Sequence, residues 1–296
     1  MKSINPGLLS ARAPYTAFVD RPVLSAPARV LVWIIVNVEH WSIDRAMPRT
    51  VLPPPMGQAL MPDLPNWSWH EYGMRAGFWR LLQALESRRI RATFAVNGVV
   101  CNSYPRVAQA ALDAGWEFIG HGNVQGPMHH LEDQAAAIRM AIDSIRRFTG
   151  STPRGWESPG LTETDQTLDL LSAAGIQYVA DWVIDDQPTW LQASPRPVLS
   201  VPYTVELNDI PVHVIQHHGS DELLKRGIAQ LARLRAEGDT NPRVMAVSVH
   251  PYITGVPHRI DYFEQLLDAI LNASDVAVMT GSAIADWYSA QVPGPD

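Results

Sequence analysis

Cysteine is almost absent from this sequence, which holds Cys101 as its one example in 296 residues. A lone cysteine excludes an internal disulfide framework and suits a reducing compartment, so we expect a cytoplasmic protein. No basic segment leads into a short apolar stretch near the N-terminus, and no apolar run is long enough to span a bilayer. Neither a secretory signal nor a membrane-inserted segment is therefore expected.

Basic residues are also sparse, because 23 lysines and arginines stand against 30 aspartates and glutamates, for a net charge of −7. They form no basic run, so neither nucleic acid nor an anionic membrane is an expected partner. The phosphate-binding patterns GxGxxG and GxxxxGK[ST] are missing as well, and no nucleotide site is indicated. Neutral or polar small molecules remain open as substrates.

The sequence does contain a regular alternation of apolar, strand-like runs and amphipathic, helix-like stretches. The first run, Val30 to Asn37, is rich in β-branched residues and is typical of a parallel strand covered on both faces. A second strand is predicted at Ala92 to Val96, and others end at His121, Glu157, Asp181 and His250. Helices are predicted near residues 73–87, 105–114, 131–148, 164–174, 222–236 and 262–272.

This order predicts an α/β fold, a distorted (β/α) barrel that forms a single domain. The barrel is expected over residues 30–292, after an irregular N-terminal arm over residues 1–29. A chain of this length is commonly one domain when it forms an α/β barrel. A doubly wound open sheet is the alternative.

Polar side chains at the carboxyl ends of the predicted strands are the candidate catalytic groups, because barrel enzymes build their sites there. Glu39 suits a general base that takes a proton from water, with a pKa raised toward neutrality by burial. His40 suits a metal ligand or an electrostatic partner. His121 lies between two glycines, and His250 is fixed by the proline that follows it. Both are candidate site imidazoles, and His250 suits an acid or a base.

Several further residues are candidates for a substrate pocket, although each also has a structural interpretation. Trp156, in a Gly- and Pro-rich turn, could instead belong to the core. The acidic loop at residues 181–188 could instead be a solvated surface. The residues that open the helix after Pro257 also suit a helix N-terminus, and His129 and His130 suit either a cap or a site. The predicted substrate-binding residues are Trp156, Glu157, Asp181, Trp182, Asp186, Tyr203, Asn208, His258 and Arg259.

Over roughly residues 30–290, the chain resembles the polysaccharide deacetylase superfamily, and within it the allantoinase-like and cyclic-imide-hydrolase-like branch. Three segments carry the resemblance. Asn37 to His40 stand where the superfamily has a strand that ends in two acids. Gly120 to Gly122 match the first metal histidine, and Ser248 to Pro251 match the late catalytic histidine.

The resemblance implies roles for four residues: Glu39 is the base, His40 stands in place of the metal-binding acid, His121 is the first metal histidine, and His250 is the general acid. The sugar deacetylases bind their metal through one Asp and two His in a His-x-x-x-His spacing. Here the residue four after His121 is Gln125. The allantoinase branch implies a site without the usual metal. A divalent metal such as zinc remains open, held by His40 and His121 and completed by His129 or His130.

The expected function is hydrolysis of a non-peptide carbon–nitrogen bond, in which water directly opens a small cyclic amide, imide or ureide. Glu39 would take the proton of water, and His250 would protonate the leaving nitrogen. A metal, or the imidazoles of His40 and His121 themselves, would polarise the carbonyl group. Two alternatives remain: a metal-dependent deacetylase of N-acetylated sugars, and a non-catalytic metabolite-binding barrel. The resemblance also suggests a homo-oligomer.

Overall fold

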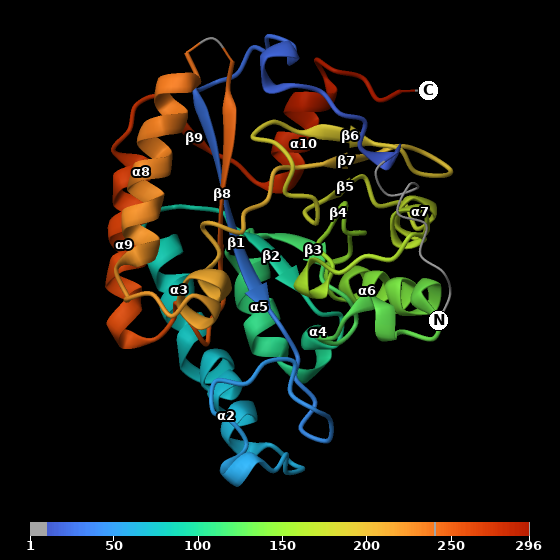
Figure 1. Ribbon diagram of the computed structural model, residues 1–296, viewed down its shortest axis with the longest axis vertical. Helices are drawn as coiled ribbons and strands as arrows, with labels where there is room; N and C mark the ends of the chain where they lie inside the picture. Colours follow the sequence, from blue (N-terminus) through green and yellow to red (C-terminus); the bar gives the residue numbers. More distant parts are fainter. Residues whose placement is uncertain (1–10, 240, 296) are drawn as a thin grey trace.

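One curled sheet forms the centre of the computed structural model, which describes residues 11–239 and 241–295 (Figure 1). The strand order is β6-β7-β5-β4-β3-β2-β1-β8, with β9 also paired to β1, and all pairs are parallel except β6 with β7. The strands are β1 (Val30–Val38), β2 (Thr93–Val96), β3 (Glu117–Gly120), β4 (Gly155–Trp156), β5 (Tyr178–Val179), β6 (Thr189–Leu191), β7 (Val198–Ser200), β8 (Arg243–Val249) and β9 (Val276–Val278). The predicted distorted (β/α) barrel is confirmed.

Helices cover the outer face of the sheet, except for α10, which packs with Trp33 on the inner face. Helix α2, with the loop before it, projects from one end of the molecule (Figure 1). The helices are α2 (Leu64–Tyr72), α3 (Phe78–Glu86), α4 (Val100–Ser103), α5 (Pro105–Asp113), α6 (Gln134–Thr149), α7 (Thr167–Ala173), α8 (Glu222–Glu237), α9 (Pro257–Leu271) and α10 (Gly281–Ser289). Two π-helical segments, η3 (Gly73–Gly77) and η6 (Ile210–Ile215), lie among them. Within the described residues, no helix has the length and apolar character needed to cross a membrane.

Strand β1 is apolar along its length because both of its faces are covered. Val32, Ile34 and Val36 belong to the core between the sheet and the helices. Leu31, Trp33 and Ile35 belong to the core inside the curl. Successive side chains of a strand point to opposite faces, so an uninterrupted apolar run is what a central strand with two cores requires.

The structure contains strands and α-helices that the sequence pattern did not predict, namely β6, β7, β9, α2, α4 and α10. The three strands have only three residues each, which is too short for a hydrophobic period to stand out. Helix α9 begins at Pro257 rather than near Tyr262, because proline is accepted in the first turn of a helix. Strand β1 begins at Val30, and the first ten residues of the predicted N-terminal arm lie outside the described residues.

The segment η3 packs against the loop that follows β8, and glycine makes this approach possible. A Cβ atom on Gly77 would overlap the carbonyl oxygen of Pro251, and one on Gly255 would overlap the backbone of Gly77. The loop begins immediately after His250, so this backbone contact helps to fix the end of β8.

We therefore expect the substitution Gly77→Ala to lower the free energy of unfolding by about 1–3 kcal/mol, because the added methyl group has no space. Denaturant unfolding measures this change. Gly126→Ala is the matched control, since a Cβ there has no neighbour within 4 Å, and it should cost less than about 0.5 kcal/mol. Equal effects of the two substitutions would contradict the close packing.

Candidate active site

Four polar side chains converge on one cavity because their strands run parallel in one curled sheet and end at the same edge. Glu39 follows β1, His121 follows β3, Glu157 follows β4 and His250 follows β8, and all four line a cavity of about 170 Å³. Each is at most 3% exposed. The strand ends therefore bring together the predicted base, two predicted imidazoles and one predicted binding residue.

The carboxylate of Glu39 accepts three hydrogen bonds from side chains. Trp41 Nε1 donates to Oε2 at 2.6 Å, and the Tyr252 hydroxyl donates to the same oxygen at 3.1 Å. Gln125 Nε2 donates to Oε1 at 2.8 Å. The other end of the Gln125 amide accepts from Asn97 Nδ2, which fixes its orientation. Each donor stabilises the ionised form of the acid.

Two imidazole nitrogens also face Glu39 Oε1: His250 Nε2 at 3.6 Å and His121 Nε2 at 4.0 Å. Burial raises the pKa of the Glu39 carboxyl, but the fields of His250, His121 and His70 and the hydrogen bond from Trp41 lower it by more. The pKa of Glu39 therefore lies below its usual value. The expectation of a raised pKa was wrong, because the sequence did not reveal the donors that surround this carboxylate.

His250 forms a dyad with Asp209, a fully buried carboxylate. His250 Nδ1 lies 2.7 Å from Asp209 Oδ1, and Asp209 Oδ2 accepts from the His250 amide at 2.7 Å and from the Thr254 hydroxyl at 2.6 Å. An ionised carboxylate only accepts, so the imidazole proton is on Nδ1 and Nε2 is directed toward Glu39. Asp209 comes immediately before η6, and sequence reasoning assigned it no role. Its signal was a polar pair, Asn208 and Asp209, between two apolar residues.

His121 has the opposite arrangement around its ring. Its Nδ1 lies 2.8 Å from the carbonyl oxygen of Glu157, so Nδ1 carries the proton. Its Nε2 is buried and has no hydrogen-bond partner among the described residues. Burial lowers the pKa of His121 to about 4, so the ring is neutral at physiological pH. Nε2 therefore presents a lone pair that can accept a hydrogen bond but cannot polarise a carbonyl group by donating one.

His40 does not line the cavity, contrary to the prediction that it joins His121. Its ring lies beside Tyr104, with 6.0 Å between the ring centroids. Burial lowers the pKa of His40, and the fields of Glu71 and Asp44 oppose this change. The residue turns away because Glu39, its neighbour on the chain, already points into the site, and consecutive residues of extended chain face opposite ways.

The side chains at the cavity do not fit a zinc centre. Over residues 11–239 and 241–295, no three His, Cys, Asp or Glu side chains are placed to hold a metal ion. His129 and His130 are exposed on a short 3₁₀ turn. The Nε2 atoms of His121 and His250 face a carboxylate that already accepts three hydrogen bonds, and within the described residues these groups do not form a set of three or four ligands placed for zinc.

Of the predicted substrate-binding residues, Glu157, Tyr203 and Asn208 line the cavity. Trp156 does not, because alternation along β4 directs Glu157 into the site and Trp156 into the core, where it is fully buried. Asp181 instead accepts a hydrogen bond from the Ser158 amide at 2.6 Å.

Trp182, His258 and Arg259 also lie away from the cavity lining. Trp182 Nε1 donates to Glu163 at 3.1 Å, which fixes the ring beside the acidic loop. His258 is exposed on α9. Arg259 donates to the carbonyl oxygen of Ile253 at 3.2 Å and so supports the loop after β8. Their positions near helix and strand ends gave no indication of which way each side chain points.

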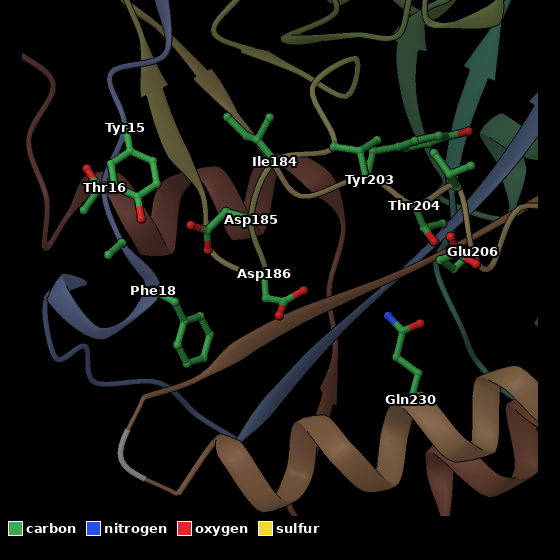
Figure 2. Close-up of a pocket in the computed structure, with 13 residues that line it drawn as sticks. Tyr15, Thr16, Phe18, Ile184, Asp185, Asp186, Tyr203, Thr204, Glu206 and Gln230 are labelled. Atoms are coloured by element: carbon green, nitrogen blue, oxygen red, sulfur yellow. The ribbon is translucent and has the colours of Figure 1, made fainter.

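Asp186 lies in a second cavity, of about 490 Å³, which is lined by the arm residues Tyr15 and Phe18 and by Gln230 on α8 (Figure 2). The two cavities share residues 203–205 as lining. Asp186 therefore lines a cavity next to the candidate active site, but it does not line the cavity that holds Glu39.

Two residues of the cavity wall were missed by sequence reasoning as binding groups. Arg49 comes from the long loop between β1 and α2, and Gln125 comes from the loop after β3. Arg49 is the cationic side chain among the lining residues. Its loop carries no hydrophobic period, so the sequence offered no signal that it returns to the strand ends.

Comparison with known proteins finds one family with a similar sequence segment and solved structures with the same fold. The family model for polysaccharide deacetylase matches residues 68–179. A protein of Schizosaccharomyces pombe (strain 972) that is named as a polysaccharide deacetylase is 28% identical over 250 residues, covering 76% of this chain and 77% of the relative.

Two crystal structures have the same fold. PuuE allantoinase has a TM-score of 0.83 and 23% sequence identity, over 93% of this chain and 96% of the other. A Pseudomonas aeruginosa PAO1 protein described as a polysaccharide deacetylase has a TM-score of 0.83 and 24% identity, over 93% and 97% of the two chains. The chain is thus similar to polysaccharide deacetylases over residues 68–179, and it shares its fold with both crystal structures.

The tautomer and the protonation state of His121 can be measured. We expect His121 to remain neutral, with its proton on Nδ1, down to about pH 4, because burial disfavours its charged form. Long-range ¹H–¹⁵N NMR of histidine-labelled protein reports both the tautomer and the titration. The same residue in urea-unfolded protein is the control and should titrate near pH 6.5. Protonation of His121 near pH 6.5 in the folded protein would contradict this assignment.

Proposed function

We propose that this protein opens a small cyclic amide, imide or ureide by direct attack of water on the ring carbonyl. The observation that carries the proposal is the set of one carboxylate, Glu39, and two imidazoles, His121 and His250, that face one cavity. The cavity volume of about 170 Å³ suits a single small ring, since a cavity of about 150 Å³ holds a molecule of the size of benzene.

Glu39 and His121 are well arranged to orient a water molecule. Glu39 Oε1 and His121 Nε2 both accept hydrogen bonds, and they lie 4.0 Å apart. A water that donates one hydrogen to each acceptor directs an oxygen lone pair away from both, toward a carbonyl carbon in the cavity. As the water attacks, its proton passes to Glu39, which acts as the general base. No covalent intermediate with the protein is required.

His250 is placed to protonate the leaving nitrogen. Its Nδ1–H is held by Asp209, so a proton on Nε2 makes an imidazolium whose charge is stabilised by Asp209 and faces Glu39 Oε1. Transfer of the Nε2 proton to the ring nitrogen completes the cleavage of the carbon–nitrogen bond. The leaving amine, amide or urea group therefore departs in neutral form.

Negative charge develops on the carbonyl oxygen in the tetrahedral intermediate, and two lining residues can stabilise it. The Arg49 guanidinium and the Asn208 amide both line the cavity and both donate hydrogen bonds. Donors that are already in place when the charge forms are an effective source of transition-state stabilisation. No step of this mechanism passes through a metal ion.

Activity assays distinguish this function from sugar deacetylation and from ligand binding without turnover. Allantoin, succinimide, hydantoin and an N-acetylated chitooligosaccharide are tested with and without a chelator, and bound metal is measured on the purified protein. We expect turnover of at least one ring compound, and a loss of about 10³-fold or more in kcat for Glu39→Gln and for His250→Gln.

Glu206→Gln is the control, because this carboxylate is exposed and pairs only weakly with Arg226 at 3.4 Å. Hydrolysis of the sugar alone, or full dependence on an added metal, would overturn the proposal. Binding of the ring compounds without turnover would support a non-catalytic barrel instead.

A cytoplasmic location and a homo-oligomeric state remain predictions from the sequence, and size-exclusion chromatography with light scattering tests the second.

The dyad makes a separate prediction. In the variant Asp209→Asn, the amide oxygen can accept from the His250 amide and Thr254, but its NH₂ group then faces His250 Nδ1. The imidazole proton moves to Nε2, and the imidazolium loses its counter-charge. We expect kcat to fall by about 10³–10⁴-fold, with the melting temperature measured in parallel. A small decrease in kcat that is proportional to the fraction of folded protein would show that Asp209 contributes to stability and not to catalysis.

A further inference from the structure

Four buried side chains beside the cavity form a closed ring of hydrogen-bonded contacts. The Tyr203 hydroxyl lies 3.0 Å from Glu157 Oε1 and 2.6 Å from Ser248 Oγ. Ser248 Oγ lies 2.7 Å from the Asn37 amide, whose other end lies 2.9 and 3.1 Å from the two Glu157 oxygens. The four residues are between 0% and 5% exposed.

The number of protons in this ring depends on the charge of Glu157. Asn37 presents its NH₂ to one neighbour and its oxygen to the other, so it supplies one proton in either orientation. Ser248 and Tyr203 supply one each. An ionised Glu157 leaves three protons for the four contacts, and two oxygen atoms must then face each other at hydrogen-bond distance without a proton.

A protonated Glu157 supplies the fourth proton, and every contact is satisfied in either direction around the ring. In one direction Glu157 donates to Tyr203, Tyr203 to Ser248, and Ser248 to Asn37, which donates back to Glu157. Asn208 Nδ2 also donates to the Tyr203 oxygen at 3.2 Å, and this contact is compatible with both directions. A fully satisfied buried network is stable, whereas one with an unpaired group is costly.

We propose that Glu157 is a neutral carboxylic acid in the working protein and that it determines specificity by leaving Glu39 as the one ionised carboxyl among the residues that line the cavity. The functional part of this inference rests on the proposed ring opening. Hydrolysis of a cyclic amide creates a carboxylate in the cavity, and a neutral Glu157 adds no repulsion against this product or against the oxyanion that precedes it.

The charged and titratable groups around Glu157 agree with the neutral form. Burial, followed by the field of Asp181, raises the pKa of Glu157 well above its usual value, and the Glu39 carboxylate adds to this shift, while the hydrogen bond from Tyr203 opposes it. The nearest imidazole nitrogen, His121 Nδ1, lies 3.8 Å away and donates to the Glu157 carbonyl oxygen instead. No Lys or Arg in the described part of the chain forms an ion pair with Glu157.

Thermal unfolding of wild type and Glu157→Gln between pH 5 and pH 8 tests the protonation state. A glutamine amide also supplies one ring proton and does not ionise. In wild type, the folded pKa of Glu157 lies above the unfolded value, so ionisation of the unfolded chain removes stability as the pH rises above about 4.5. We expect the melting temperature of the variant, relative to wild type, to rise by about 3 °C per pH unit.

Glu206→Gln is the matched control and should show a flat difference over the same range. A flat or falling difference for Glu157→Gln would mean that Glu157 is ionised when folded, and it would overturn the proposal. Infrared spectra of wild-type protein with ¹³C-labelled glutamate give a second measurement that does not depend on the variant. At pH 7 we expect a protonated-carboxyl band that shifts in D₂O, and its absence would also overturn the proposal.

Inhibition by succinamate, a carboxylate of the kind that ring opening produces, tests the functional part. We expect its inhibition constant for wild type to rise about tenfold per pH unit once Glu157 ionises at alkaline pH. A pH-independent inhibition constant across the ionisation detected by infrared would overturn the role in specificity. If no ring compound is hydrolysed while the infrared and melting results are as expected, the proposed reaction fails and the neutral Glu157 stands.

Discussion

The rest of the site depends on one constraint, the burial of an ionised carboxylate at the end of the central strand. Removing such a charge from water costs several kcal/mol unless donors replace the water. Around Glu39, Trp41 and Tyr252 supply donors to one oxygen and Gln125 supplies one to the other. These three side chains come from segments far apart in the sequence, so the charge can be buried only when the strand ends and their loops are assembled together.

A further layer of contacts holds the donors in place. The His70 ring stacks on Trp41, with 4.7 Å between the centroids, and its Nε2 donates to the Glu39 carbonyl oxygen at 3.0 Å. Helix α2 therefore fixes both the main chain of the base and one of its donors. This explains why a projecting helix with little contact to the sheet carries a histidine that is only 1% exposed. The loop and helix between β1 and β2 are part of the site as well as a cover for it.

The sequence predicted the parts of this protein that follow from a regular period. The uninterrupted apolar run of β1 indicated a parallel strand with two covered faces. The strand-end acid and imidazoles that the sequence singled out, Glu39, His121 and His250, line one cavity in the structure. The sequence could not show which way the side chains next to those strand ends point. A shift of one residue along a strand exchanges its inward and outward faces, and His40 and Trp156 are two examples. The sequence also could not place Arg49 or Asp209, since loops without a period bring them to the site.

Gln125 illustrates how one substitution changes the chemistry that a strand-end site can support. A histidine four residues after His121 would offer a nitrogen lone pair to a metal, whereas the glutamine amide at this position donates a hydrogen to Glu39. The same position therefore changes from an acceptor that holds a cation to a donor that holds the base. With Glu39 kept ionised by such donors and Glu157 enclosed by hydroxyl and amide groups, the two buried carboxyl groups have pKa values displaced in opposite directions. Two like acids at the strand ends of one sheet can then serve different functions because their hydrogen-bond partners differ.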